Sequence, residues 1–340
     1  MRTTAAPWVR PRIRRERRVH GEVLVRQLEY LVALARERHF GRAAQSCHVS
    51  QPTLSGAIAK LETNLGVMIV MRGRRFEGFT EEGARVVRWA HRILAERDAL
   101  LADIDRMHGG ITATVRIGAV PTAIPATPLI TERFSVHNPM AGVQIEALAS
   151  REITRRLAEF ELDAGVTYLD DETPPGLRRI ELYRERYLLL IERAHPTAAS
   201  EVVEWEAAAK LPLCVLTAEM RNRRILDATM ASVGERIRPS IETDNVGALY
   251  AYVATRQLPS IVAHTWLHAF GVPDGMCVRP LREIRPRPVL GLVLSDGTPP
   301  SIIADALAES LRDADLSGLL DLSLEAALAK CADVDSSTAH

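Results

Sequence analysis

The residues best suited to chemistry in this sequence form a short polar run, Ser50-Gln51-Pro52-Thr53-Leu54-Ser55. Ser50 suits a helix N-cap, because its hydroxyl can accept a hydrogen bond from an unpaired backbone N–H. Pro52 suits the first turn, where its missing N–H costs nothing. Hydroxyl and amide groups in that turn can also read base edges in a major groove about 12 Å wide. Taken alone, the run predicts only a capped and solvated helix.

Arginines surround this polar run and would suit contacts with phosphate. Arg42 precedes it, and Arg72, Arg74 and Arg75 follow it in a predicted turn. The whole chain is neutral, but residues 1–110 carry 20 basic and 12 acidic side chains, and the remainder carries 23 and 31. This asymmetry favours a polyanion as the partner of the N-terminal part, with solvated charges or local composition as the alternative.

The elements that would position these residues can be read from apolar spacing. Apolar residues three or four apart predict a helix from Val25, a short helix over 42–47 and a third helix from Ser50 to Gly66. Two short helices with a tight connection indicate a helix-turn-helix, in which the second helix enters the major groove. Residues 67–72 and 76–80 predict a β-hairpin, or wing, with its arginines at the tip.

A long helix is predicted from about Thr80 to His108, ended by Gly109-Gly110. No neighbouring segment of the sequence is needed to bury its apolar stripe, so we expect a partner subunit to bury it. The stripe consists of Val86, Val87, Ala90, Ile93, Leu94, Leu100, Leu101 and Ile104.

From Thr114 onward, short apolar strands alternate with helices, which predicts an α/β module with open sheets. In such sheets ligands bind beyond the carboxyl ends of the strands, near helix N-termini. After this module, leucines between Leu319 and Leu328 allow one further amphipathic helix.

Residues 24–108 resemble the winged helix-turn-helix and linker helix of LysR-type transcriptional regulators. The resemblance is carried by "RQLEYLVALARERHFGRAAQSCHVSQPTLSGAIAKLETNLGV" and "RGRRFEGFTEEGARV". Two departures are Gly56, where a basic or polar residue is common, and Val70-Met71-Arg72 in place of Leu-Phe-x-Arg. The order of the second module resembles the family's effector domain, which has two subdomains like those of periplasmic binding proteins and covers the chain to about residue 312.

The resemblance implies a domain plan. We expect a disordered basic arm at 1–23, unless translation begins near Val23 or Val25. It is followed by the DNA-binding domain at 24–82, the linker helix at 83–110, the effector domain at 111–312 and a tail at 313–340. The chain would cross between subdomains near 191–195 and 281–288.

It also implies a function, that of a regulator of transcription that binds promoter DNA and responds to a small effector. We expect Gln51, Thr53 and Ser55 to read bases, Ser50 and Pro52 to shape the turn, and the four arginines to contact phosphates. Two-fold symmetry favours an inverted repeat read by a homodimer, and we expect a homotetramer.

The effector would lie between the subdomains. Thr122, at a predicted helix start, favours a carboxylate or other small anion. Each residue has a cap or surface role as its alternative. The expected contacts are Pro121, Thr122, Ala123, Thr167, Tyr168, Asn222, Arg223, Thr243 and Asn245.

Other classes of function find little support in the sequence. Common nucleotide-binding and hydrolase motifs are absent, so an enzyme carrying a helix-turn-helix remains only an alternative. The four cysteines lie far apart, which disfavours a disulfide framework but leaves a redox-responsive regulator as a second alternative. His264 and His268 are four apart without a neighbouring carboxylate. We expect no cofactor, no metal, no membrane span and no secretory signal, and hence a cytoplasmic protein rather than a transport receptor.

Overall fold

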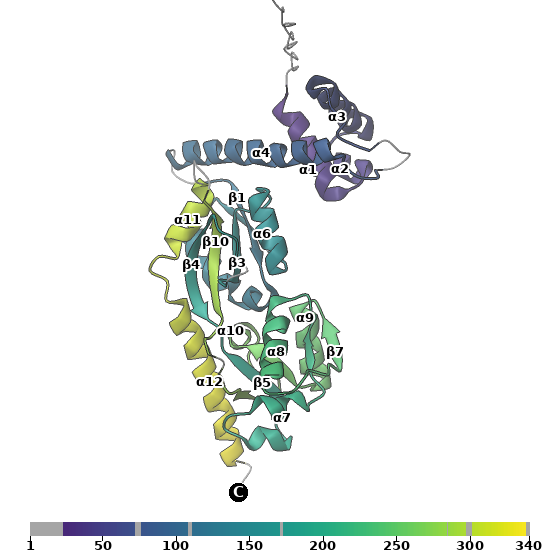
Figure 1. The fold of residues 1–340 in the computed structure, drawn as a ribbon. Helices are drawn as coiled ribbons and strands as arrows, with labels where there is room; N and C mark the ends of the chain where they lie inside the picture. Colours follow the sequence, from purple (N-terminus) through teal and green to yellow (C-terminus); the bar gives the residue numbers. More distant parts are fainter. Residues whose placement is uncertain are drawn as a thin grey trace, which may run out of the picture. The chain divides into compact units, whose positions relative to one another are not determined.

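The computed structural model describes residues 23–71, 76–107, 111–170, 173–283, 285–296 and 301–337. These residues divide into two compact units, one up to Leu94 and one from Ala95 (Figure 1). The expected basic arm at 1–23 lies almost wholly outside the described residues, as do Arg72, Arg74 and Arg75 at the tip of the expected wing.

The first unit contains the expected helix-turn-helix. Helix α1 spans Val25–Glu37, α2 spans Phe40–Ser46 and α3 spans Gln51–Leu65. The apolar stripes meet in one core, where Leu31, Leu34, Leu54 and Leu61 are fully buried. Gly66 ends α3 in the left-handed conformation with φ of 67°, which glycine adopts without steric cost.

The wing is described only at its base, on either side of residues 72–75. Its described part has a single antiparallel bridge, Val70↔Phe79, supported by a hydrogen bond from Met71 N to Gly78 O of 3.0 Å. Phe76 packs edge-on against Phe40 and Phe79, with ring centroids 6.1 and 5.1 Å away. These aromatic contacts pack the base of the wing against α2, which begins at Phe40.

Helix α4 spans Glu81–Met107 and begins where expected. Thr80 Oγ1 accepts a hydrogen bond of 2.8 Å from Gly83 N, which caps the helix. A Cβ on Gly83 would lie 2.0 Å from the carbonyl oxygen of Ile69, so only glycine fits there. The predicted apolar stripe is divided: Ala90 and Leu94 are buried in the first unit, whereas other apolar side chains are exposed. The exposed ones are Trp89, Ile93, Leu100, Leu101 and Ile104.

The second unit begins with a five-stranded sheet that forms the core of subdomain I, in the order β2-β1-β3-β10-β4. Strand β1 (Thr114–Ala119) is parallel to β2 (Gly142–Ala147) and β3 (Ala164–Tyr168). Strand β10 (Val289–Ser295) is antiparallel to β3 and to β4 (Leu177–Arg184). The helical elements of this subdomain are η1 (Pro121–Ala126), α5 (Thr127–His137), α6 (Ser150–Ala158) and α11 (Ile302–Ser310).

Subdomain II contains two small sheets. Strand β5 (Tyr187–Glu192) pairs with β8 (Ser260–Ala263) and β9 (Met276–Pro280), and β6 (Cys214–Leu216) is parallel to β7 (Ile241–Thr243). The larger helices around them are α8 (Arg221–Ser232), α9 (Val246–Arg256) and α10 (Thr265–Phe270). The shorter elements are η2 (Pro196–Ala199) and α7 (Trp205–Ala209).

The expected first crossover near 191–195 is wrong. Strand β4 belongs to the sheet of subdomain I and β5 to a sheet of subdomain II, so the chain crosses at Glu185-Arg186. Residues 187–191 form a fully buried strand, and the sequence pattern of such a strand does not indicate which of two sheets it joins. The chain returns within 281–288, between β9 and β10.

The C-terminal tail forms α12, which spans Leu316–Ser337. Its early residues Leu316 and Leu320 are buried in the core of subdomain I, and Leu324 and Cys331 in the core of subdomain II. Helix α12 therefore runs along both subdomains (Figure 1), and an ion pair of 3.1 Å joins its Asp321 to Arg186 at the crossover.

Candidate functional site

The first turn of α3 presents the polar run to solvent. Ser50, Gln51, Pro52 and Thr53 are exposed, and Ser55 is half-buried. Ser50 Oγ accepts a hydrogen bond of 3.3 Å from Thr53 N and lies 2.8 Å from Thr53 Oγ1. Leu54, on the opposite side of this turn, is fully buried. The turn is therefore held rigidly by one face while the other stays accessible.

Of the four arginines expected to contact phosphate, Arg42 alone lies among the described residues. Its side chain is exposed, donates to Glu37 O at 2.6 Å and lies 3.6 Å from a Glu37 carboxylate oxygen. An exposed pair of this kind contributes little stability, so Arg42 can exchange Glu37 for another anion at small cost.

A buried carboxyl lies where the two subdomains meet. Glu185 is 1% exposed, and its Oε2 accepts hydrogen bonds from Tyr168 of subdomain I at 2.8 Å and Tyr187 of subdomain II at 2.6 Å. Thr122 Oγ1 lies 3.1 Å from the Tyr168 hydroxyl, and Asn222 Nδ2 donates to the Tyr187 hydroxyl at 3.4 Å. Burial raises the pKa of Glu185, although the hydrogen bonds from the tyrosines oppose that shift. The innermost part of the interface is thus filled by the chain's own polar side chains.

Beside this cluster, a small groove opens between β3, α6 and α8. It has a volume of about 20 Å³ and is lined by Ser150, Arg151, Thr154, Thr167, Tyr168, Asp170, Thr173 and Arg221. Thr167 is 1% exposed, and neither its hydroxyl nor that of Ser150 has a hydrogen-bond partner among the described residues. Buried hydroxyls normally bond to protein or to ordered water, so these two make the groove a candidate site for a water or a polar ligand.

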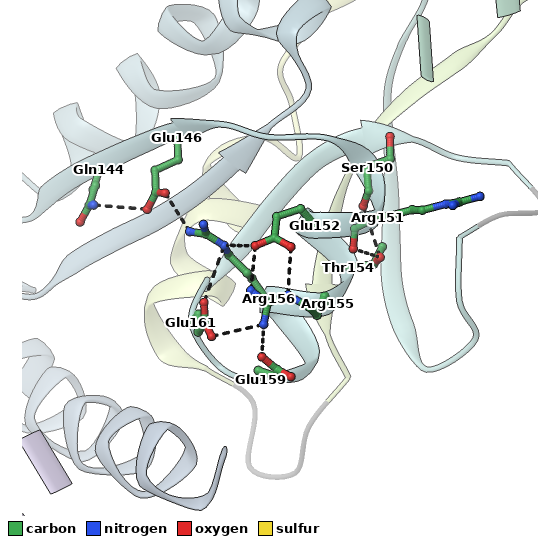
Figure 2. Close-up of polar contacts among 10 residues, drawn as sticks. All are labelled: Gln144, Glu146, Ser150, Arg151, Glu152, Thr154, Arg155, Arg156, Glu159 and Glu161. Carbon is green, nitrogen blue, oxygen red and sulfur yellow. Dashed lines mark hydrogen bonds and ion pairs between the residues drawn. The ribbon is translucent and has the colours of Figure 1, made fainter. Parts of the chain in front are cut away.

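Arg151 differs from the other arginines of α6. Figure 2 shows Arg155 and Arg156 turned toward a group of carboxylates, and Arg151 pointing away from it. Arg156 lies 2.8 Å from Glu146 and 2.6 Å from Glu152, and the pKa of Glu152 is lowered to about 2, chiefly by its hydrogen bond from Arg155. Arg151 is exposed at the groove and forms no ion pair within the described part of the chain.

The nine residues expected to line an effector site come together only in part. Thr167 and Tyr168 line the groove, and Thr122 and Asn222 belong to the Glu185 cluster behind it. Thr122 lies in the first turn of a helical segment, as expected, but this turn belongs to the 3-10 helix η1, which α5 follows from Thr127.

Three of the nine residues have structural roles instead. Arg223 is 6% exposed and engaged by Asp227, Glu242 and Leu216 O at distances of 2.6–2.9 Å. Asn245 caps α9 by accepting from Ala248 N, and Thr243 Oγ1 accepts from Asn245 N. None of the three lines the groove. The hydrogen bonds of Thr243 and Asn245 fit the cap alternative, and their effector role stays a prediction.

Sequence reasoning missed the residues that give the groove its charge. These residues are Arg151, Asp170 and Arg221. Two of them lie close in the chain to expected effector contacts, since Asp170 follows Tyr168 by two positions and Arg221 directly precedes Asn222. Glu185 carried a clearer signal, since it is the acid just before the apolar run 187–191.

A larger hollow of about 470 Å³ lies between α4, β1 and α11. Its charged residues Arg116 and Asp163 are bound to each other by two side-chain hydrogen bonds of 3.0 Å. No unpartnered buried polar group lines this hollow among the described residues, so it is a weaker candidate for a polar ligand.

The cysteines and histidines offer little chemistry. Cys214, Cys277 and Cys331 are buried and Cys47 is half-buried, and burial raises the pKa of Cys214 to about 11. His264 is buried and His268 is exposed beside Ser323. Within the described ranges no three His, Cys, Asp or Glu side chains are grouped to hold a metal, and no helix there is long and apolar enough to cross a membrane.

Comparison with known proteins accounts for both units. Residues 25–84 match the family described as "Bacterial regulatory helix-turn-helix protein, lysR family", and residues 108–315 match the "LysR substrate binding domain". The chain is 31% identical over 308 residues to the "DNA-binding transcriptional dual regulator OxyR" of Escherichia coli K12, covering 85% of this chain and 94% of the relative. It is also 31% identical over 299 residues to the "Hydrogen peroxide-inducible genes activator" of Pectobacterium carotovorum, covering 85% and 96%.

Solved structures share the fold. A full-length OxyR variant from Pseudomonas aeruginosa is similar with a TM-score of 0.67 and 24% identity, covering 88% of this chain and 97% of that one. CbnR in complex with its target DNA is similar with a TM-score of 0.63 and 18% identity, covering 86% and 100%. The chain therefore belongs to the LysR family of DNA-binding transcriptional regulators, which are not enzymes.

Proposed function

We propose that this regulator reads its operator through the first turn of α3 and responds to a small anionic effector bound in the groove beside α6. In the DNA-binding unit, Gln51, Thr53 and Ser55 would contact base edges, while Ser50 and Pro52 shape the turn and Arg42 contacts phosphate. The exposure of this turn, on a helix whose other face is buried, is the observation that carries the proposal.

Selection of bound duplexes from a random-sequence library tests the DNA contact and identifies the operator in the same experiment. Gln51→Ala is expected to relax sequence preference at one position, because a bidentate contact to a base discriminates by about 1–3 kcal/mol. Gln144→Ala, an exposed glutamine in the effector unit, serves as the matched control. Equal loss on selected and random DNA for Gln51→Ala would contradict a base-reading role.

The expected assembly stays a proposal. Trp89, Ile93, Leu100 and Leu101 of α4 are 42–61% exposed, which favours burial against a second copy, and a homodimer would place two α3 helices on an inverted repeat. Sedimentation equilibrium should give a dimer or the expected tetramer. A monomer at micromolar concentration would refute both.

The anionic effector is supported by three features of the groove. The Thr167 and Ser150 hydroxyls are buried without partners, and Arg151 has no carboxylate partner among the described side chains. Ser150 also begins α6, where the helix dipole favours negative charge. Deeper in the interface, the Glu185 carboxyl is already engaged by the hydroxyls of Tyr168 and Tyr187.

A thermal-shift screen of small carboxylates and inorganic phosphate, at constant ionic strength, tests the effector class. Arg151→Gln is expected to weaken binding about tenfold, the usual scale for one lost charge contact. Arg238→Gln removes an exposed arginine outside the groove and should bind as the wild type does. If neutral compounds bind and anions do not, the proposed charge preference is wrong.

A redox response remains a second candidate. The Cys331 sulfur accepts a hydrogen bond of 3.3 Å from Val278 N, which is adjacent in the chain to Cys277, so two cysteines lie near each other. Peroxide could oxidise this pair to a disulfide while being reduced to two waters. Burial of both thiols slows such chemistry. Thiol labelling before and after peroxide, combined with DNA binding, would reveal a switch as a loss of free thiol together with altered affinity.

A further inference from the structure

An ion pair joins the two subdomains at the proposed effector groove. Asp170 follows β3 in subdomain I, and Arg221 is the first residue of α8 in subdomain II. Arg221 Nε and Nη2 lie 2.8 and 2.6 Å from the same oxygen, Asp170 Oδ2. The two side chains are 22% and 28% exposed, so water screens this contact only in part. Both residues line the groove.

The charges around the groove do not balance. Arg151 and Arg221 contribute two positive charges, and Asp170 is the single carboxylate among the described lining residues. The N-termini of α6 and α8 add positive potential, which makes an arginine at the start of α8 unfavourable without an anion beside it. Asp170 supplies that anion for Arg221, while the hydroxyls of Ser150 and Thr167 stay without partners among the described residues.

We infer that Asp170 occupies the place of the effector's acidic group at Arg221, and that a bound anion displaces it. This inference rests on the proposed effector function. A ligand carboxylate or phosphate would take over Arg221, bind Arg151 and the two hydroxyls, and release Asp170. The groove of about 20 Å³ has room for about one water, so entry of an anion requires the subdomains to separate there.

Displacement of Asp170 converts binding into a structural signal. The contact between Asp170 and Arg221 is one of those that join subdomain I to subdomain II, and an anion that replaces it favours the state in which this contact is broken. A ligand shifts such an equilibrium only by its difference in affinity for the two states, and competition with Asp170 supplies that difference. The crossovers at Glu185-Arg186 and 281–288 would carry the movement.

The test uses the full-length protein with inorganic phosphate and oxalate as probes, in buffers of constant ionic strength. Binding is measured by calorimetry, and hydrogen exchange is followed in peptides covering both crossovers. Asp170→Asn removes the competing charge and is expected to bind a probe anion about tenfold more tightly, with faster exchange at the crossovers before any anion is added. Arg221→Gln should show the same faster exchange but bind anions at least tenfold more weakly.

Two further variants keep the test falsifiable. Asp170→Glu retains the carboxylate and should stay within threefold of the wild type in anion affinity. Asp274→Asn removes an exposed carboxylate outside the groove and should leave affinity and exchange unchanged. If the wild type binds a probe and Asp170→Asn binds it no better, displacement is wrong while the effector proposal stands. If neither protein binds any probe, the anionic effector is wrong, and displacement with it.

Discussion

The proposed DNA-reading turn and the proposed effector groove are built in opposite ways. Residues 50–55 are contiguous, exposed, and fixed by a cap and by the buried Leu54 within one helical turn. The groove takes its residues from β3, α6, α8 and the loop after β3, and its key hydroxyls are buried. A contiguous site survives as long as its helix folds, whereas a dispersed site depends on the angle between two subdomains.

The largest expected effect tests whether the two sites are independent. Leu54→Ala removes a fully buried side chain from the helix-turn-helix core and should lower the stability of that unit by about 2–5 kcal/mol. Denaturation and DNA titration should both report the loss, while anion binding at the groove stays unchanged. Leu322→Ala, at a 64% exposed position of α12, is the control. Loss of anion binding in Leu54→Ala would show that the units are coupled.

The next effect concerns acid stability of the subdomain crossover. His264 accepts a hydrogen bond from Arg186 N, and burial is the main cause that lowers its pKa from 6.5 to about 4. The unfolded chain therefore binds more protons than the native one between these values, so stability rises with pH across this window by roughly 3 kcal/mol. His264→Asn, which retains an acceptor, should flatten the curve between pH 4 and 6.5 in urea denaturation. An unchanged slope would rule out His264 as its source.

The buried carboxyl of Glu185 predicts a fall in stability with rising pH, opposite to the effect of His264. Its pKa is raised by burial, so the native state holds a proton that the unfolded state releases above about pH 4.5. Stability is therefore lost as pH rises toward the native pKa, by at most about 1.4 kcal/mol per pH unit. Glu185→Gln should remove this decline, while Glu181→Gln, at an exposed site on β4, should keep it. A decline that persists in Glu185→Gln would contradict the assignment.

A smaller effect separates a cap from an effector contact. Asn245→Ala should destabilise α9 by about 0.5–2 kcal/mol, because Ala248 N loses its partner. Anion affinity should not change, and Asn245→Ser should recover most of the stability. Calorimetry on the same samples measures the anion affinity. Weaker anion binding by Asn245→Ala would indicate that Asn245 contacts the effector.

The smallest expected effect is a gain in stability from a substitution in α3. Gly56 is exposed within the helix, and a Cβ there would meet no atom within 4 Å. Gly56→Ala should raise stability by about 0.5–1 kcal/mol through lower conformational entropy of the unfolded chain. Thermal melting measures this gain. A decrease would mean that the surface of α3 is less open than the structure indicates.

The sequence allowed the helix-turn-helix, the linker helix and the alternating α/β order to be predicted, because periodic apolar residues and caps act within a few residues of each other. The resemblance to the LysR family implied that Thr167, Tyr168, Thr122 and Asn222 lie near the interface between subdomains. The predicted position of the first crossover was wrong. Residues 187–191 are all apolar, and such a strand fits the sheet of subdomain I as well as a sheet of subdomain II. For Thr243 and Asn245 the sequence left a cap and an effector contact as alternatives, and the structure shows the hydrogen bonds of a cap.

The sequence by itself determined which segments become helices and strands, and which turn of which helix stays polar and exposed. Only the tertiary structure decided that Asp170 contacts Arg221 and that Glu185 accepts hydrogen bonds from two tyrosines. It also decided that the hydroxyls of Ser150 and Thr167 have no hydrogen-bond partner among the described residues. Asp170 and Arg221 lie 51 positions apart in the chain, and Tyr168 and Glu185 lie 17 apart. Their contacts depend on how sheets and helices pack, which no local pattern of residues encodes.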